Sequence, residues 1–237
     1  MVGHGVTLIF YYGFGVQVVN SRGCSFLGFT LDSSPPNYAQ GIVQQVDGAT
    51  FDADFSNDFI PPVGGPFAAP GGLSGAKTAF WDSTTKRMLP LGNQFMAGAV
   101  RLPTPSSLGR YRVTLQAPVR GAIVPGKTPV TIFGRRGFTW NLVNSTEIKT
   151  DSVTIYAGGN MGFHESGGLG GNLYSRVRVV RRPGSDGLLA LNADGFHSDS
   201  VGLGPRLLDS EISFTGDDFL NIHNRTWSVQ QSALDMV

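Results

Sequence analysis

One local layout occurs twice in this chain, and it restricts the possible fold more than any other feature. Val-Asn-Ser occupies residues 19–21 and 143–145, and the strand-like triplets Phe-Thr-Leu and Val-Thr-Ile follow at 29–31 and 153–155. The offset from the asparagine to the triplet is identical in the two copies (29 − 20 = 153 − 144 = 9). An Asn-Ser turn followed by an inward-pointing strand is typical of one coil of a β-solenoid.

Further short segments with a period of two indicate more coils. In YSRVRVV we expect Val177 and Val179 to face inward while Arg176 and Arg178 face water. One coil cannot bury its apolar face alone, so the coils must stack on one another. The segments that we assign to further coils are 174–180, 207–214 and 219–223.

A stretch of different character separates the two matching coils. It contains FDADFSNDF, a run rich in Pro and Gly, and several strand-like pieces. We therefore expect an all-β fold, a right-handed parallel β-helix with an inserted small β-barrel-like subdomain. Its parts are coils at 1–45, the insertion at 46–130, and coils carrying an acidic site at 131–237. FDADFSNDF resembles a calcium-ligand cluster but lacks the glycine and terminal glutamate of an EF-hand loop, so we interpret it as a solvated turn.

Composition agrees with a turn-rich β protein, since 33 glycines and 14 prolines accompany a hydrophobic content of 41%. The formal net charge of +1, with acids and bases intermixed, favours neither nucleic acid nor a membrane surface as a partner. Cys24 is the one cysteine, which excludes an internal disulfide and gives no zinc-site spacing. The apolar opening lacks a basic start and a cleavage site, so we interpret it as strands with no targeting signal.

The segment that points to chemistry runs from 192 to 223. Asp194 stands before a glycine, and Asp217 and Asp218 follow one, at a separation of 23 residues (217 − 194 = 23). This separation is close to the circumference of one β-helix coil. We therefore expect the three carboxylates to lie side by side on neighbouring coils.

Crowded carboxylates suit hydrolysis of a glycosidic bond. The reaction needs one carboxylic acid that protonates the leaving oxygen and one carboxylate that activates water or attacks the sugar. Mutual repulsion raises one pKa so that both forms coexist near neutrality. In an ideal strand Asp217 and Asp218 point to opposite faces, so both can reach one groove only if the strand begins after Asp218. Asp-Gly and Gly-Asp pairs are also ordinary turn residues, which is the structural alternative.

Other polar residues near these acids are candidates for substrate binding. His197, His223 and Asn221 belong to the same two coils. One coil earlier, a glycine-rich segment carries His164 and Glu165, which we expect either at the rim of the groove or in a mobile loop. We expect no metal and no cofactor at this site.

The acidic motifs resemble those of a known group of enzymes. NADGFHS at 192–198, followed by GDDFLNIH at 216–223, is similar to the paired motifs of right-handed parallel β-helix glycosidases, and in particular of glycoside hydrolase family 110, the α-1,3-galactosidases. The segments 32–47 and 170–198 also resemble the layout of that family. Polygalacturonases have a comparable acidic pairing, but the cysteine and the downstream basic motif expected there are missing here.

The resemblance implies an inverting, exo-acting glycosidase that removes terminal α-1,3-linked galactose. Asp194, Asp217 and Asp218 match the acidic positions of the family, and the partner would be an oligosaccharide or polysaccharide. Such proteins are exported, so we expect a secreted or periplasmic location. The sequence gives no expectation for the oligomeric state.

Alternative functions stay open at this point. The chain ends soon after the third acid, whereas the family continues through further coils, so it would be a fragment or a divergent, inactive homologue. A noncatalytic glycan-binding or adhesion β-helix would use the acids to bind sugar or calcium. A uronic-acid lyase or epimerase would need a basic catalytic residue, for which Arg225 is the nearby candidate, and we rank it last.

Overall fold

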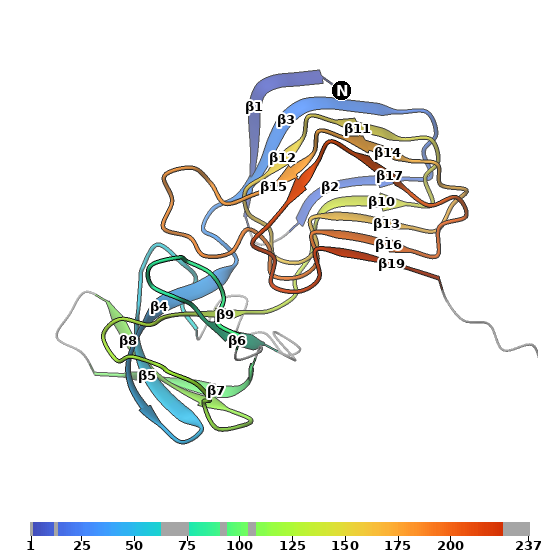
Figure 1. The fold of residues 1–237 in the computed structure, drawn as a ribbon. Coiled ribbons are helices and arrows are strands. Elements are labelled where there is room, and N and C mark those ends of the chain that lie inside the picture. Colours follow the sequence, from blue (N-terminus) through green and yellow to red (C-terminus); the bar gives the residue numbers. More distant parts are fainter. Residues whose placement is uncertain (1, 12–13, 63–75, 91–93, 104–107, 225–237) are drawn as a thin grey trace, which may run out of the picture.

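The computed structural model describes residues 2–11, 14–62, 76–90, 94–103 and 108–224 of the chain. In these ranges the regular elements are β strands, arranged as a stack of parallel coils and an antiparallel barrel (Figure 1). The expected fold class, a parallel β-helix with an inserted β-barrel, is confirmed. The described ranges contain no helix with the length and hydropathy needed to cross a membrane.

One side of the β-helix is a five-stranded parallel sheet to which each coil contributes one strand. Its order is β2 (Phe14–Val19), β10 (Phe138–Val143), β13 (Phe163–Ser166), β16 (Phe196–Asp199) and β19 (Leu220–His223). We call it the site sheet, because the acidic residues lie at the start of its last two strands.

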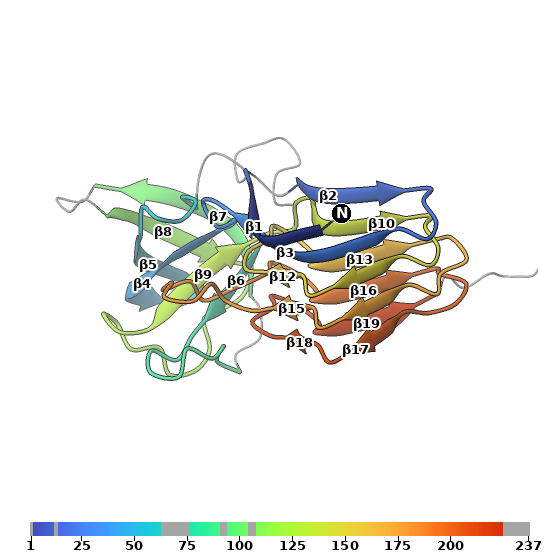
Figure 2. The ribbon, with the colours of Figure 1, turned by 90° about the horizontal axis from the view of Figure 1, so that it is seen from above.

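A second parallel sheet forms another side, and isolated bridges that join Gly158, Leu191 and Thr215 mark the third. Figure 2 shows the two sheets stacked coil on coil. The members of the second sheet are β1 (Val2–Phe10), β3 (Ser25–Ser33), β11 (Lys149–Asp151), β12 (Thr154–Ile155), β14 (Leu173–Ser175), β15 (Arg178–Val179), β17 (Arg206–Leu208) and β18 (Glu211–Ile212).

The repeated Val-Asn-Ser layout is stacked as the sequence predicts. Val19 pairs with Val143 in register, and the Asn144 side chain donates a hydrogen bond of 2.8 Å to Oδ1 of Asn20. Both asparagines are left-handed, with φ of 49° and 47°, a conformation that asparagine tolerates better than most residues. The asparagines therefore form the corner at which each coil leaves the site sheet.

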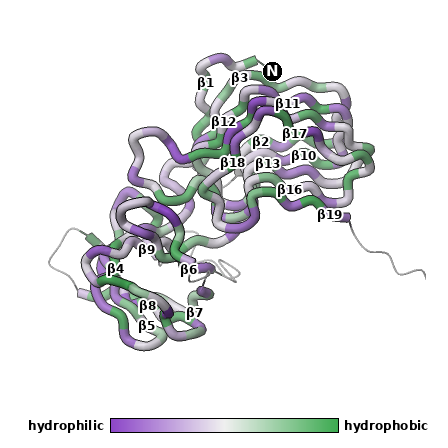
Figure 3. Tube along the Cα trace, viewed as in Figure 1, coloured by the Kyte–Doolittle hydropathy of each residue, from purple (hydrophilic) through white to green (hydrophobic). Residues whose placement is uncertain are grey.

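The core of the β-helix is a ladder of aromatic residues in equivalent positions of successive coils. Trp140 pairs with Phe163, and Phe163 pairs with Phe196; each of the three is fully buried. Val177 and Val179 are also fully buried, as expected. Figure 3 shows hydrophobic and hydrophilic stretches interchanging along the coils, as a fold buried on one face of each strand requires. Truncating one ladder ring to alanine would cost about 3–5 kcal/mol of stability.

The insertion is a closed antiparallel barrel, wider in sequence than the expected range 46–130. Its first and last strands pair with each other, with Tyr38 opposite Phe133. Only four residues, 34–37 and 134–137, separate these two strands from the neighbouring coil strands, so the sequence carries no long linker that would mark either boundary. In barrel order the strands are β4 (Tyr38–Asp47), β5 (Thr50–Phe55), β8 (Gly109–Leu115), β7 (Gln94–Leu102), β6 (Lys77–Phe80) and β9 (Pro129–Phe133).

The interpretation of FDADFSNDF as a solvated turn is wrong for its first half. Phe51, Ala53 and Phe55 point into the barrel core from β5. The acids between them face outward, where Asp52 pairs with an arginine at 2.8 Å and Asp54 pairs with another at 2.7 Å. The arginines, Arg112 and Arg110, belong to the neighbouring strand β8, and a pairing between distant strands is not visible in a local motif.

Candidate active site

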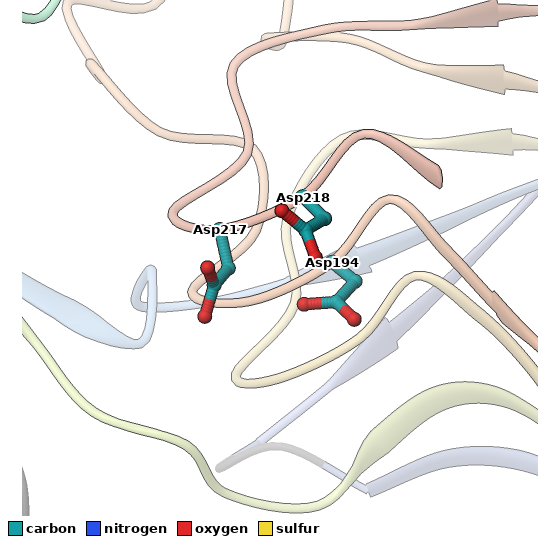
Figure 4. Close-up of side chains that lie close together, drawn as sticks. All are labelled: Asp194, Asp217 and Asp218. Carbon is teal, nitrogen blue, oxygen red and sulfur yellow. The ribbon is translucent and has the colours of Figure 1, made fainter. Parts of the chain in front are cut away.

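Three carboxylates meet where the chain enters the last two strands of the site sheet. Phe196 pairs with Leu220, so Asp194 and Asp218 occupy equivalent positions 24 residues apart (220 − 196 = 218 − 194 = 24). One carboxylate oxygen of each of Asp194, Asp217 and Asp218 lies within 4.8 Å of the others. Figure 4 shows that all three side chains come from turns outside the strands.

The strand boundaries remove the difficulty of alternating faces. β19 begins at Leu220 and β16 at Phe196, so none of the three acids is subject to strand alternation. Gly216 and Gly195 allow the tight path before each strand, because a Cβ atom at Gly216 would lie 2.6 Å from the carbonyl oxygen of Asn192 and one at Gly195 would lie 2.1 Å from the Ile212 side chain.

Asp194 and Asp218 are joined by an amide. The Asn221 side chain lies 3.4 Å from Oδ2 of each carboxylate and can donate to both. Asp194 is 2% exposed, whereas Asp218 is exposed to solvent. The pair thus combines one sheltered and one open carboxylate, an arrangement that suits different roles in catalysis.

Asp217 differs from the other two because it is neutralised by cations from outside the coils. Lys77 of the barrel strand β6 donates to its Oδ2 at 2.8 Å, and Arg135 forms a second ion pair with the same oxygen. Partial burial acts to raise the pKa of Asp217, but the hydrogen bonds and charges of Lys77 and Arg135 outweigh it, so the pKa lies below its ordinary value. Asp217 is therefore a stable anion and a poor proton donor.

A row of histidines runs along the outer face of the site sheet beside the acids. His197 contacts Asp194 through Nδ1 at 2.6 Å, and its Nε2 lies 3.1 Å from Nε2 of His223. His164 lies one coil away, with its Nδ1 2.7 Å from Oδ1 of Asn141. When Asp194 is ionised, Nδ1 of His197 is the donor in this contact, because a carboxylate only accepts. The structure brings all three expected histidines to the sheet face.

The environment of His164 keeps its ring neutral. The ring stacks on Phe138 with centroids 4.6 Å apart. Burial and, to a smaller extent, the electrostatic interaction with the His197 ring lower the pKa of His164 to about 4, and the carboxylates of Asp199 and Asp194 offset this only in part. His164 is thus a neutral hydrogen-bonding group at ordinary pH.

The expectation that Glu165 lies at the rim is wrong. Residues Phe163–Ser166 form strand β13, and alternation turns Glu165 inward, where it is 1% exposed. Its carboxylate accepts hydrogen bonds from the Ser198 hydroxyl at 2.7 Å, the Asn172 amide at 2.9 Å and the Tyr174 hydroxyl at 3.0 Å. Glu165 is part of a buried polar network and has no route to a substrate.

Two residues of the site were missed by sequence reasoning. Lys77 lies 140 residues before Asp217 and Arg135 lies 82 residues before it. Neither stands in a recognisable motif, and both approach only because the barrel docks beside the coil corner. Arg225, the candidate base of a lyase, lies outside the described residues.

Comparisons with known proteins give no family. No family model matches the sequence, and no curated protein matches it. Among solved structures, the tailspike protein gp49 of Pseudomonas phage LKA1 is similar over 83% of this chain and 37% of that one, at 12% identity and a TM-score of 0.22. The tailspike gp61 of Pseudomonas phage phi297 is similar over 89% and 37%, at 9% identity and a TM-score of 0.23.

This chain therefore spans little more than a third of the length of either tailspike. The similarity to them is weak and assigns neither a family nor an activity. Membership of glycoside hydrolase family 110 stays a prediction.

Proposed function

We propose that the chain is a glycoside hydrolase whose acid and base are Asp194 and Asp218. The observation that carries the proposal is the pair of carboxylates from neighbouring coils, linked by Asn221 and placed beside the histidine row on the outer face of the site sheet. Hydrolysis of a glycosidic bond requires one proton donor and one carboxylate in this proximity.

In this proposal Asp217 is a positioning residue. Two cations hold it as an anion, so it neither donates a proton nor acts as a strong base. Its contacts fix the turn that carries Asp218 and join that turn to the barrel. The pair that remains, Asp194 and Asp218, has no cationic partner from Lys or Arg among the ion pairs of the described residues.

The substrate to which the sequence resemblance points is terminal α-1,3-linked galactose. That resemblance also implies inversion, for which carboxyl groups stand roughly 6.5–9.5 Å apart. Retention would instead need the two carboxyl groups only roughly 5–5.5 Å apart, with one of them attacking the sugar directly. The first anomer released decides between the two: β-galactose shows inversion and α-galactose shows retention.

The decisive experiment measures galactose release from an α-1,3-linked disaccharide, with circular dichroism to verify folding. We expect Asp194→Asn and Asp218→Asn each to lower kcat by about 10²–10⁴. Asp209→Asn is the matched control, since Asp209 is exposed on the turn between β17 and β18. Wild-type turnover in both site variants would overturn the proposal, and saturable glycan binding without turnover in the wild type would identify a binding protein instead.

A further inference from the structure

A groove of about 730 Å³ lies at the opposite end of the site sheet from the acids, and its function is unassigned. Its lining includes Val143, Ser166 and Asp199, which are the last residues of their strands. It also includes Ser200 and Asn224, where the chain turns away from the sheet. Because it borders the same strands as the acidic residues, it belongs to the same surface of the β-helix.

The corner of the coils creates this hollow. At the residue after each strand the backbone is left-handed, with φ of 47° at Asn144, 63° at Gly167 and 57° at Ser200. The chain therefore bends sharply away from the sheet in three successive coils. Glycines line the bend and add no side chains to fill it.

The groove and the acids share one face of the sheet. In β16, His197 and Asp199 point outward while Phe196 and Ser198 are buried, so Asp199 at the groove lies on the same side as the histidine beside Asp194. In β13, Ser166 is two residues after His164, so its side chain points to the same outer face of the sheet. A ligand lying along a strand would meet both places.

A chain of polar contacts connects the two ends. Asp194 contacts His197 at 2.6 Å, and His197 contacts His223 at 3.1 Å. His223 in turn lies 3.7 Å from Asp199 at the groove. Strand β16 rises about 10 Å over the three residue steps from Phe196 to Asp199, which is longer than one pyranose ring.

We propose that the groove binds further sugar units of the glycan whose glycosidic bond lies at the acids, so that the ligand is a neutral oligosaccharide. This inference rests on the proposed function for the position of the bond, and it adds the length and charge of the substrate. Val143 offers apolar surface for a ring face, and the serine and asparagine side chains offer partners for hydroxyl groups.

The charge of the surface selects against acidic glycans. None of the described lining residues is basic, and Asp199 adds a carboxylate. At the other end, Lys77 and Arg135 are already paired with Asp217. A polyuronate would therefore find no basic side chain among the described lining residues of the groove.

The test measures binding by isothermal titration calorimetry in an Asp218→Asn protein, so that turnover does not interfere. The probes are galactose, the neutral trisaccharide Galα1-3Galβ1-4Glc, and trigalacturonate as an acidic chain of equal length. Ser166→Trp and Val143→Trp each fill the groove from a different strand. Val100→Trp is the matched control, because Val100 is 66% exposed on the barrel strand β7.

We expect the trisaccharide to bind at least tenfold more tightly than galactose and than trigalacturonate. In each groove-filling variant the trisaccharide should bind no more tightly than galactose, whereas in Val100→Trp it should still bind more tightly. Equal affinity for galactose and the trisaccharide, an equal or higher affinity for trigalacturonate, or a gain that survives both groove variants would overturn the proposal. Failure of the hydrolase proposal is distinguishable from failure of the groove proposal. The first shows only as absent turnover in the wild type, whereas the second shows in the binding affinities of the Asp218→Asn protein.

Discussion

The ammonium group of Lys77 lies 2.8 Å from Oδ2 of Asp217, which joins a barrel strand to the acidic corner of the β-helix. Both side chains are largely sheltered, with 19% and 27% of their surface exposed. The pair therefore links the barrel to the candidate site and, together with Arg135, holds one of the three adjacent carboxylates as an anion.

Lys77→Met should raise the pKa of Asp217, because one of its two cations is lost. The lowered pKa of Asp217 contributes stability above the unfolded value of 3.8, and that contribution disappears as the pH falls through the folded value. We expect a loss of about 1 kcal/mol at pH 7 that vanishes as the pH falls through the folded pKa of Asp217. Urea denaturation against pH measures it, with the exposed Lys127→Met as control; a difference that persists in acid would contradict the ion-pair explanation.

His164 should make the protein less stable as the pH falls from 6.5 to 4. Its folded pKa of about 4 lies below the ordinary 6.5, so between these values the unfolded state binds more protons and stability rises with pH. The effect is on the order of 2 kcal/mol across that window. His164→Gln should flatten the stability profile by this amount, and parallel profiles of the two proteins would refute the assignment. A proton NMR titration of the ring measures the pKa directly.

Removing the carboxylate of Glu165 should destabilise the β-helix. Glu165→Ala leaves three buried donors without their acceptor, at a cost on the order of 3–5 kcal/mol. Glu165→Gln keeps an acceptor oxygen and should cost less. Chemical denaturation compares both with Glu147→Ala, whose side chain is 57% exposed and pairs with Arg22 at the surface. An equal, small effect of all three substitutions would contradict the buried network.

Removal of divalent cations should leave the protein unchanged. Three acidic residues lie close enough to hold an ion, but Lys77 and Arg135 already neutralise Asp217, so a cation would have to displace them. We expect the same Tm in EDTA and in excess calcium by differential scanning fluorimetry. A rise in Tm with calcium that is lost in Asp218→Asn would instead identify a metal site at the three acids.

Much of the β-helix could be predicted from sequence, because its signals are local. The Asn-Ser corner at 20 and 144 and the alternation of Val177 and Val179 are each visible within a few residues. The proximity of the acids likewise follows from the coil repeat, but the equivalent positions are Asp194 and Asp218, 24 residues apart, and not Asp194 and Asp217. These features depend on backbone periodicity, which a sequence records directly.

The rest depended on contacts that a sequence does not record. The sequence does not distinguish Asp217 from Asp194, because Lys77 and Arg135, which neutralise Asp217, are distant from it in the chain. Glu165 stood in a glycine-rich segment that suggested a loop, yet tertiary pairing of β13 between β10 and β16 made it a buried strand residue. In both cases the role is decided by the neighbours in space.

The pairing of Tyr38 with Phe133 bears on the order in which the chain folds. The coil ladder between β2 and β10 joins residues 124 positions apart, and closing so long a loop is entropically slow. If the barrel assembles first, its first and last strands, β4 and β9, already deliver the two coil ends to the same place. The folded insertion then holds the two coil ends close together, which lowers the entropic cost of pairing the first coil with the second.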